Sequence, residues 1–210
     1  MGDFSAERAL KGSAKARKSG SATNPFALFF REFLHHPVMI GAIIPSSRRT
    51  IDHMLSRVDW ASTKLFVEYG PGVGTFCGTI LSKLAPDATL IVIDTNPVFI
   101  DYLRRKFTDS RFVAVHGSAA DVNEIVAEHG FEKADYVLSG LPFSTLPAGV
   151  GAAIADATHR VIKVGGAFLV YQYSNYVLRL VEPLFERVDH DVEWWNIPPC
   201  RLHWAWKDEE

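Results

Sequence analysis

The chain has 210 residues, of which 48% are apolar and 22% are charged, and its formal net charge is −2. This length and composition are typical of one globular domain with a sizeable core. The balanced charge gives no reason to expect a nucleic-acid partner. No apolar run approaches the roughly 20 residues that span a bilayer, and the polar N-terminus lacks the apolar centre of a signal peptide. We therefore expect a cytoplasmic protein.

The two cysteines, Cys77 and Cys200, lack the spacing of a metal site or a redox pair. We expect two packed thiols, with no disulfide and no bound metal.

Residues 1–60 are predicted to form an extension before the main domain. Residues 1–20 contain five Lys and Arg against two Asp and Glu. Such a segment is either a disordered, solvated tail or an arm attracted to anionic lipid headgroups. A helix is predicted next, with Asn24 as its N-cap and Pro37 after its end. One face of this helix is apolar, and it suits either the core or a membrane surface: Phe26, Phe29, Phe30, Phe33 and Leu34.

Beyond Trp60 the pattern changes to short apolar segments separated by helical ones, which is typical of parallel strands buried on both faces. The predicted strands are 65–69, 90–94, 111–115, 134–140 and 166–173, with helices at 99–107 and 150–163. Residues 185–195 and 201–207 follow without a helix between them and predict an antiparallel hairpin. The fold class expected for residues 61–210 is α/β, a Rossmann-like sheet of five parallel strands closed by this hairpin.

The segment FVEYGPGVGTF, residues 66–76, places a glycine-rich turn directly after a strand. Its spacing is G-x-G-x-G, whereas the pyrophosphate fingerprint needs G-x-G-x-x-G, and Thr75 stands where the third glycine would be. Glu68 would repel a phosphate and suits a cation instead. The second strand ends at Asp94, where a carboxylate can accept both hydroxyls of a ribose. An alternative for residues 94–97 is a simple helix cap.

Together these motifs resemble the class I S-adenosylmethionine-dependent methyltransferases, whose seven-stranded sheet agrees with the pattern above. The resemblance covers about residues 61–207. It implies S-adenosylmethionine as cofactor, S-adenosylhomocysteine as product, and cofactor contacts from Glu68, Gly70, Gly72, Gly74, Thr75, Asp94, Thr95, Gly117, Ser118, Ala119 and Ser139. The third motif departs from the family pattern, because no acidic residue directly follows the third strand. The adenine partner stays open between Ser118, the backbone amide of Ala119 and Asp121.

The segment SGLPFSTLP, residues 139–147, follows the fourth strand and resembles the catalytic loop of class I N-methyltransferases acting on amines. The resemblance implies catalytic roles for Ser139 and Leu141 and places Phe143 over the substrate amine. The alternative is an ordinary strand-to-helix turn built on Gly140 and Pro142. The rRNA adenine dimethylases share this loop.

The basic N-terminal arm, GAIIPSSRR (41–49) and the late NIPP (196–199) extend the resemblance to the bacterial phospholipid N-methyltransferases. That family methylates phosphatidylethanolamine and its mono- and dimethyl derivatives towards phosphatidylcholine, as a peripheral membrane enzyme. The resemblance therefore implies a lipid amine substrate, anionic lipids as partners, and peripheral association with the inner membrane. Alternatives are an rRNA adenine, an ornithine lipid or a small-molecule amine as the acceptor. The oligomeric state is left open.

Aromatic side chains are the expected partners of a methylated ammonium. Tyr171 and Tyr173 end the fifth strand, where open α/β sheets bind ligands, and one of them can assist loss of the amine proton. Tyr176 is a further substrate candidate. Ser46 and Arg48 are candidates for the headgroup phosphate, the alternative being an exposed surface position.

Overall fold

A computed structural model describes residues 48–196 and 199–208. Its helices, with the short 3-10 turns η2 and η3, are α2 (Arg48–Met54), α3 (Cys77–Lys83), α4 (Pro97–Lys106), η2 (Ala119–Asp121), α5 (Val122–Glu128), η3 (Phe143–Thr145), α6 (Val150–Val161) and α7 (Leu178–Val181). Its strands are β1 (Leu65–Tyr69), β2 (Thr89–Asp94), β3 (Phe112–His116), β4 (Ala134–Ser139), β5 (Ile162–Gln172), β6 (Arg187–Glu193) and β7 (Cys200–Trp206).

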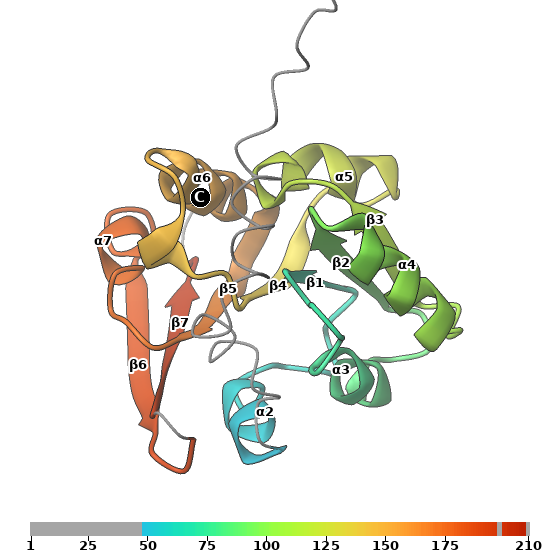
Figure 1. The fold of residues 1–210 in the computed structure, drawn as a ribbon, viewed down its shortest axis with the longest axis horizontal. Helices are drawn as coiled ribbons and strands as arrows, with labels where there is room; N and C mark the ends of the chain where they lie inside the picture. The colour runs from blue at the N-terminus through green and yellow to red at the C-terminus, as the bar shows by residue number, and fades with distance from the viewer. Residues whose placement is uncertain (1–47, 197–198, 209–210) are drawn as a thin grey trace, which may run out of the picture.

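The strands form one seven-stranded sheet in the order β3-β2-β1-β4-β5-β7-β6. β1 to β5 are mutually parallel, and β7 is antiparallel to both β5 and β6. The sheet separates two layers of helices, with α2 and α3 on one side and α5 and α6 on the other (Figure 1). The predicted fold class, including the closing hairpin, is confirmed.

The central strands read as apolar runs because both of their faces are covered. Every residue of β1 and β4 is buried, and alternate side chains enter two apolar clusters on opposite faces of the sheet. Phe66 belongs to the cluster under α2 and α3, whereas Val67 belongs to the cluster under α5 and α6. Because both faces are buried, these strands lack the alternation of apolar and polar residues that is typical of a sheet with one exposed face.

Most element boundaries differ from the sequence prediction by a few residues, and the largest difference is at the start of β5. The helix expected to reach residue 163 ends at Val161, and β5 already begins at Ile162. The pairing of β4 with β5 is irregular between Ala134 and Tyr136, and Gly165 has a φ of +80°. The strand therefore starts early and passes through an irregularity that periodicity alone does not reveal.

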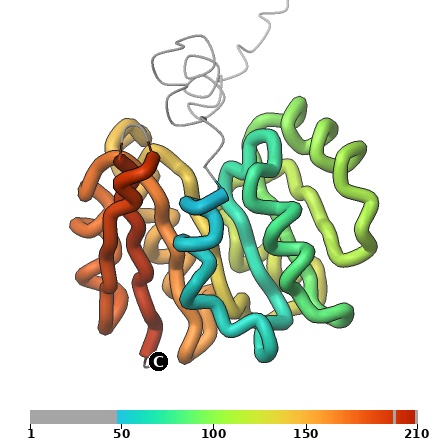
Figure 2. The backbone as a smooth tube through the Cα atoms, turned by 90° about the horizontal axis from the view of Figure 1, so that it is seen from below, coloured from blue at the N-terminus to red at the C-terminus, as the bar shows by residue number. Residues whose placement is uncertain are grey.

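Six strands, β1 to β6, point towards one edge of the sheet, which we call the carboxyl edge. β6 joins this set because it is antiparallel to β7, which is itself antiparallel to β5. Figure 2 shows the end of β6 and the start of α2 at the same end of the molecule, opposite the end of β7. The carboxyl edge is where ligands bind in open parallel sheets.

The basic tail, the phenylalanine-rich helix and Ser46 lie outside the described residues, so these predictions are not addressed by the structure. Within residues 48–196 and 199–208, none of the helices combines the length and the apolar character needed to cross a membrane.

Candidate active site

The glycine-rich turn after β1 adopts backbone conformations that favour glycine. Gly70, Gly72 and Gly74 all have positive φ angles, of +60°, +55° and +76°. A Cβ on Gly74 would lie 2.7 Å from side-chain atoms of both Leu103 and Phe107. The amide of Gly70 donates to Ile93 O at 2.9 Å, which fixes the turn against the end of β2. The turn therefore brings the ends of β1 and β2 together at the carboxyl edge.

Glu68 lies near the end of β1 and is only 2% exposed. Its Oε2 accepts a hydrogen bond from Cys77 Sγ at 3.2 Å. Burial raises the pKa of Glu68 to about 7, the Cys77 hydrogen bond opposes this rise, and the charge of Asp94 adds to it. Because the carboxyl group is enclosed, its expected contact with a cationic ligand stays a prediction. In the structure Glu68 instead links β1 to the first residue of α3.

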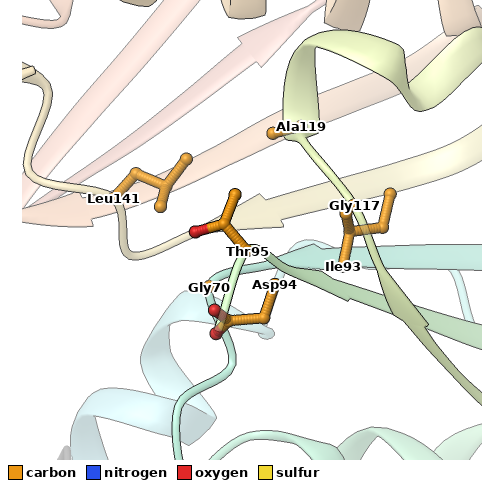
Figure 3. A pocket seen from close by; sticks show the side chains of 7 residues that line it. All are labelled: Gly70, Ile93, Asp94, Thr95, Gly117, Ala119 and Leu141. Carbon is orange, nitrogen blue, oxygen red and sulfur yellow. The ribbon is translucent and has the colours of Figure 1, made fainter. Parts of the chain in front are cut away.

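A small pocket opens between the turn and the ends of β2 and β3 (Figure 3). It is lined by Gly70, Ile93, Asp94, Thr95, Gly117, Ala119 and Leu141. Five of these seven were predicted as cofactor contacts and one, Leu141, as catalytic. The fold therefore gathers residues from the first, second and third motifs and from the loop after β4 into one place.

Two polar atoms at this pocket have no hydrogen-bond partner in the described structure, Asp94 Oδ2 and Thr95 Oγ1. Asp94 Oδ1 accepts from the amide of Asn96 at 2.8 Å. Burial raises the pKa of Asp94 to about 6, against the opposing effect of the Asn96 and Gly72 backbone amides. Buried polar atoms without a partner are costly and rare in folded proteins. Here they provide an acceptor and a hydroxyl for a ligand that enters the pocket.

The alternative interpretation of residues 94–97, a helix cap, is seen in the structure at Asn96. Asn96 caps α4, its Oδ1 accepting from the amide of Val98 at 2.9 Å. The cap uses Asn96 alone, so Asp94 and Thr95 remain directed at the pocket (Figure 3).

The three candidates for the adenine partner occupy different positions. Ala119 lines the pocket, and the side chain of Asp121 is exposed to solvent. Ser118 Oγ accepts from the amide of Ala120 at 3.1 Å and so caps η2. Gly117 also lines the pocket, and its amide donates to Asp94 O at 3.1 Å. Of the three, the structure brings Ala119 nearest to the other pocket residues.

The loop after β4 differs from the expected arrangement in two of its residues. Ser139 is fully buried, and its Oγ accepts from the amide of Leu141 at 3.2 Å, so its hydroxyl braces the loop. Phe143, expected over the substrate amine, instead packs edge-on against Phe168 in the core and is 2% exposed. The η3 turn directs this ring inward, where burial of its apolar surface is favourable. Leu141 alone of these residues reaches the pocket.

Tyr171 lies beside this loop near the end of β5. Its ring packs against Phe76 with centroids 4.8 Å apart. Burial raises the pKa of Tyr171 well above its ordinary value, and the charge of Glu68 adds to the rise. The phenol is therefore protonated at every physiological pH.

The remaining substrate candidates do not line the pocket. Tyr173 and Tyr176 are exposed at the carboxyl edge after β5. Arg48 is 96% exposed and lies 4.0 Å from Asp52, which agrees with the alternative of a surface position. Thr75 and Gly72 belong to the turn without lining the described pocket.

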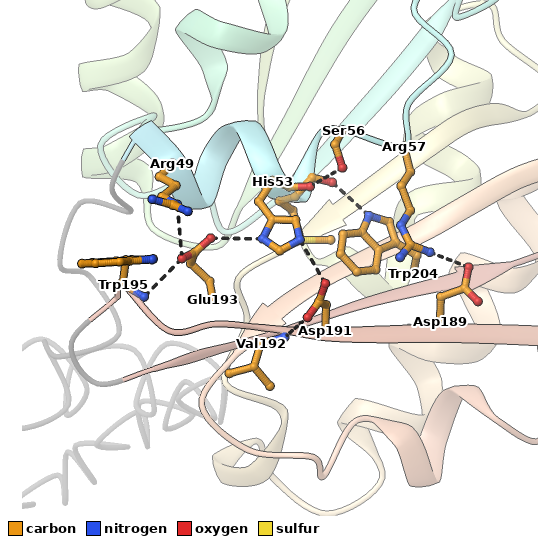
Figure 4. Close-up of polar contacts among 11 residues, drawn as sticks. Arg49, His53, Ser56, Arg57, Asp189, Asp191, Val192, Glu193, Trp195 and Trp204 are labelled. Atoms are coloured by element: carbon orange, nitrogen blue, oxygen red, sulfur yellow. Dashed lines mark hydrogen bonds and ion pairs between the residues drawn. The ribbon is translucent and has the colours of Figure 1, made fainter.

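Sequence reasoning missed a cluster between α2 and β6 (Figure 4). His53 contacts Glu193 Oε2 at 3.0 Å and Asp191 Oδ2 at 3.2 Å. Arg49 lies 3.9 Å from Glu193 and over the ring of Trp195. These groups are about 140 residues apart in sequence, and no local pattern signals their contact.

Comparison with known proteins bears on the fold. No family model matches the chain. Among solved structures, precorrin-6y C5,15-methyltransferase from Geobacter metallireducens superimposes with a TM-score of 0.61 at 17% identity, covering 77% of this chain and 89% of that one. The N-methyltransferase NodS from Bradyrhizobium japonicum also gives 0.61, at 16% identity, covering 79% and 98%. The chain has the class I S-adenosylmethionine-dependent methyltransferase fold. The resemblance read from the sequence is confirmed at this level.

Two curated proteins are similar to this chain in sequence. Ornithine lipid N-methyltransferase of Singulisphaera acidiphila is 29% identical over 182 residues, covering 86% of this chain and 95% of that protein. Ribosomal RNA small subunit methyltransferase H of Burkholderia vietnamiensis is 33% identical over 95 residues, but this match covers only 45% of this chain and 29% of that protein. The lipid enzyme is therefore similar along nearly its whole length, and the rRNA enzyme only in part.

Proposed function

We propose that this protein is an S-adenosylmethionine-dependent N-methyltransferase that acts on the amine of a membrane lipid. The observation that carries the proposal is the similarity to an ornithine lipid N-methyltransferase over 86% of this chain and 95% of that protein. The products are S-adenosylhomocysteine and a lipid with a methylated amine.

The pocket residues fit the cofactor. Asp94 Oδ2 can accept hydrogen bonds from ribose hydroxyls, and Thr95 Oγ1 adds a second unpartnered group beside it. Gly70 allows close approach of the backbone, and Ala119 and Leu141 offer apolar walls for an adenine ring. When bound, S-adenosylmethionine supplies an electrophilic methyl group on a positively charged sulfonium. Glu68 lies in β1 just before the turn, and in its ionised form it attracts the positively charged sulfonium.

Two lipids are candidate acceptors. The resemblance to phospholipid N-methyltransferases supports phosphatidylethanolamine and its mono- and dimethyl derivatives, towards phosphatidylcholine. The name of the Singulisphaera relative supports an ornithine lipid. Both lipids present an amine at a bilayer surface, so either requires a site that faces the membrane. The partial match to the rRNA enzyme gives weaker support to an RNA acceptor.

The chemistry requires a neutral amine, because a protonated amine has no lone pair. Burial raises the pKa of both Tyr171 and Tyr173, so neither phenol is ionised near neutral pH. An un-ionised phenol is a poor base, so of the two expected routes, water or one of these tyrosines, we propose that the proton leaves to water. Tyr171 then acts by holding the loop after β4 in place. Rate acceleration comes from positioning and from excluding water, as in other direct transfers.

The test is an assay with purified full-length protein, S-adenosylmethionine labelled in its methyl group, and three kinds of vesicle. One kind contains phosphatidylethanolamine, one an ornithine lipid, and one phosphatidylglycerol with phosphatidylcholine and no amine acceptor; a fourth reaction contains rRNA. We expect label in the extracted lipid from at least one amine-containing vesicle and none from the third kind. Label in RNA alone, or in no acceptor, would contradict the proposal.

A further inference from the structure

The exposed apolar side chains of the described residues are not spread evenly. Six of the eight large ones follow the carboxyl end of a strand and therefore lie at the carboxyl edge: Val73, Val98, Tyr173, Tyr176, Trp194 and Trp195. The other two, Tyr102 and Val164, lie within α4 and near the start of β5. The carboxyl edge is also the edge on which the pocket opens.

Trp194 and Trp195 are the most exposed of these residues, at 73% and 72%. They follow β6 at the tip of the β6–β7 hairpin. Two neighbouring tryptophans that are both mostly exposed are unusual on a globular protein, because each ring offers a large apolar surface. An indole combines this surface with a polar N–H group, which suits the boundary between water and lipid.

The hairpin tip is held in place by buried charge (Figure 4). Glu193 is 4% exposed, and its Oε1 accepts from the amide of Trp195 at 3.2 Å. Its Oε2 contacts His53 Nδ1 at 3.0 Å, which ties the tip to α2. The guanidinium of Arg49 lies 5.3 Å from the centroid of the Trp195 ring. The tryptophans thus extend from a supported tip rather than from a free loop.

We propose that the carboxyl edge docks onto a lipid bilayer, with Trp194 and Trp195 inserted among the headgroups. This inference rests on the proposed function, since a lipid acceptor must reach the pocket from the membrane. Charge at the edge agrees with it, because the side chain of Arg49, over Trp195, is 66% exposed and that of Arg48, at the start of α2, is 96% exposed.

The exposed apolar residues also extend along much of the carboxyl edge, which suits contact with a flat surface such as a bilayer. Val98 follows β2, and the tryptophans follow β6. These strands are separated by five steps in the sheet order, or about 24 Å at roughly 4.8 Å per step. A bilayer that touches both ends also reaches the pocket beside the ends of β1 and β2 and presents the lipid amine to it. A second copy of the chain is the other occupant to test, and the experiment distinguishes it from a bilayer.

The test measures binding without cofactor, so that it does not depend on methyl transfer. Full-length protein is sedimented with vesicles of phosphatidylglycerol and phosphatidylcholine, which contain no amine acceptor. We expect the Trp194→Ala/Trp195→Ala variant to bind these vesicles about tenfold more weakly, because two interfacial anchors are lost. Tyr102→Ala removes an exposed aromatic ring away from the edge and should bind like the parent. Thermal unfolding of each variant checks that the fold is retained.

Direct contact is tested with lipids brominated in their acyl chains, which quench nearby tryptophan fluorescence. Trp194→Phe/Trp195→Phe keeps apolar rings at the tip but removes the two indoles. We expect this variant to bind while losing most of the quenching seen with the parent. Unchanged sedimentation of the alanine variant, or unchanged quenching of the phenylalanine variant, overturns the proposal. A parent that is dimeric and an alanine variant that is monomeric by light scattering would assign the face to a second copy.

Discussion

The phenol oxygen of Tyr171 lies directly against Gly140, so that a Cβ on Gly140 would fall 2.3 Å from Tyr171 Oη. Tyr171 belongs to β5, and Gly140 is the first residue after β4. The absence of a side chain at position 140 is thus what lets the ring reach the loop that carries Leu141. The end of β5 and the proposed catalytic loop are held as one unit.

Gly140→Ala should disturb this unit. The added methyl group must displace Tyr171 or shift the loop, and such overpacking typically costs about 1–3 kcal/mol of the free energy of unfolding. In the double variant Gly140→Ala/Tyr171→Phe the nearest clashing atom is gone, so we expect part of the loss to be recovered. Urea denaturation of the parent, both single variants and the double variant gives the interaction energy. If the changes in the free energy of unfolding of the two single variants simply add in the double variant, the contact between Gly140 and Tyr171 does not contribute to stability.

Tyr171→Phe should lower turnover while leaving cofactor affinity unchanged. The ring and its packing on Phe76 remain, but the hydroxyl that contacts the loop is lost, so we expect a fall in kcat of about tenfold through poorer positioning. Calorimetry with S-adenosylhomocysteine measures the affinity, and the lipid assay measures kcat. Tyr102→Phe, on the exposed side of α4, is the matched control. Equal turnover of Tyr171→Phe and the parent would remove Tyr171 from the site.

Much of the fold could be predicted because its signals are local. The apolar runs that become β1, β2 and β4 are each five or six residues long and lie next to helical segments. The glycine turn was recognisable because positive φ at Gly70, Gly72 and Gly74 leaves a direct trace in the residue type. A strand end such as Asp94 likewise marks the carboxyl edge in any parallel sheet.

The remaining features depend on side-chain direction and on contacts between distant segments. Phe143 was expected at the substrate because its motif is shared with amine methyltransferases, but the η3 turn places its ring in the core. The pair His53 and Glu193 joins α2 to β6 across 140 residues. Nothing in either segment alone requires the other, so only the folded chain reveals the supported tip with Trp195.

Asp94→Asn should weaken binding of the adenosine moiety and reduce its pH dependence. The pKa of Asp94 is raised to about 6 by burial, and ribose hydroxyls donate to the ionised form. Affinity should therefore be greatest above pH 6 and fall as the pH drops below 6. The asparagine variant should bind about tenfold or more weakly at pH 7.5, since hydrogen bonds to a charged group contribute about 1.5–3 kcal/mol.

The ligand for this measurement is methylthioadenosine, which lacks the charged amino-acid part of the cofactor and so isolates the ribose contact from Glu68. Calorimetric titrations at pH 5 and pH 7.5 give the two affinities. Equal affinity of the parent at both pH values would show that Asp94 does not accept the ribose hydroxyls.

Both thiols should be unreactive in the native protein. Cys77 and Cys200 are buried, and burial raises the pKa of Cys77 well above its ordinary value and that of Cys200 to about 12. The reactive thiolate is therefore scarce at pH 8. A disulfide reagent should react with both thiols only in denaturant. S-adenosylhomocysteine should slow the reaction of the native protein further, because it stabilises the fold. Rapid native labelling of one thiol would contradict this burial.

Glu68→Gln should change the pH dependence of stability in the ligand-free protein. The pKa of Glu68 is about 7 in the folded chain, against an ordinary value of 4.5 for a glutamate in the unfolded chain, so the folded state binds more protons than the unfolded state between these values. The free energy of unfolding must then fall as the pH rises from about 4.5 to 7, by on the order of 3 kcal/mol from this group.

Glutamine keeps an acceptor for Cys77 Sγ and removes the buried charge. We expect the variant to match the parent near pH 5 and to exceed it at pH 8, measured by urea denaturation, with exposed Asp121→Asn as the control. A variant less stable than the parent at pH 8 would show that ionised Glu68 stabilises the ligand-free turn.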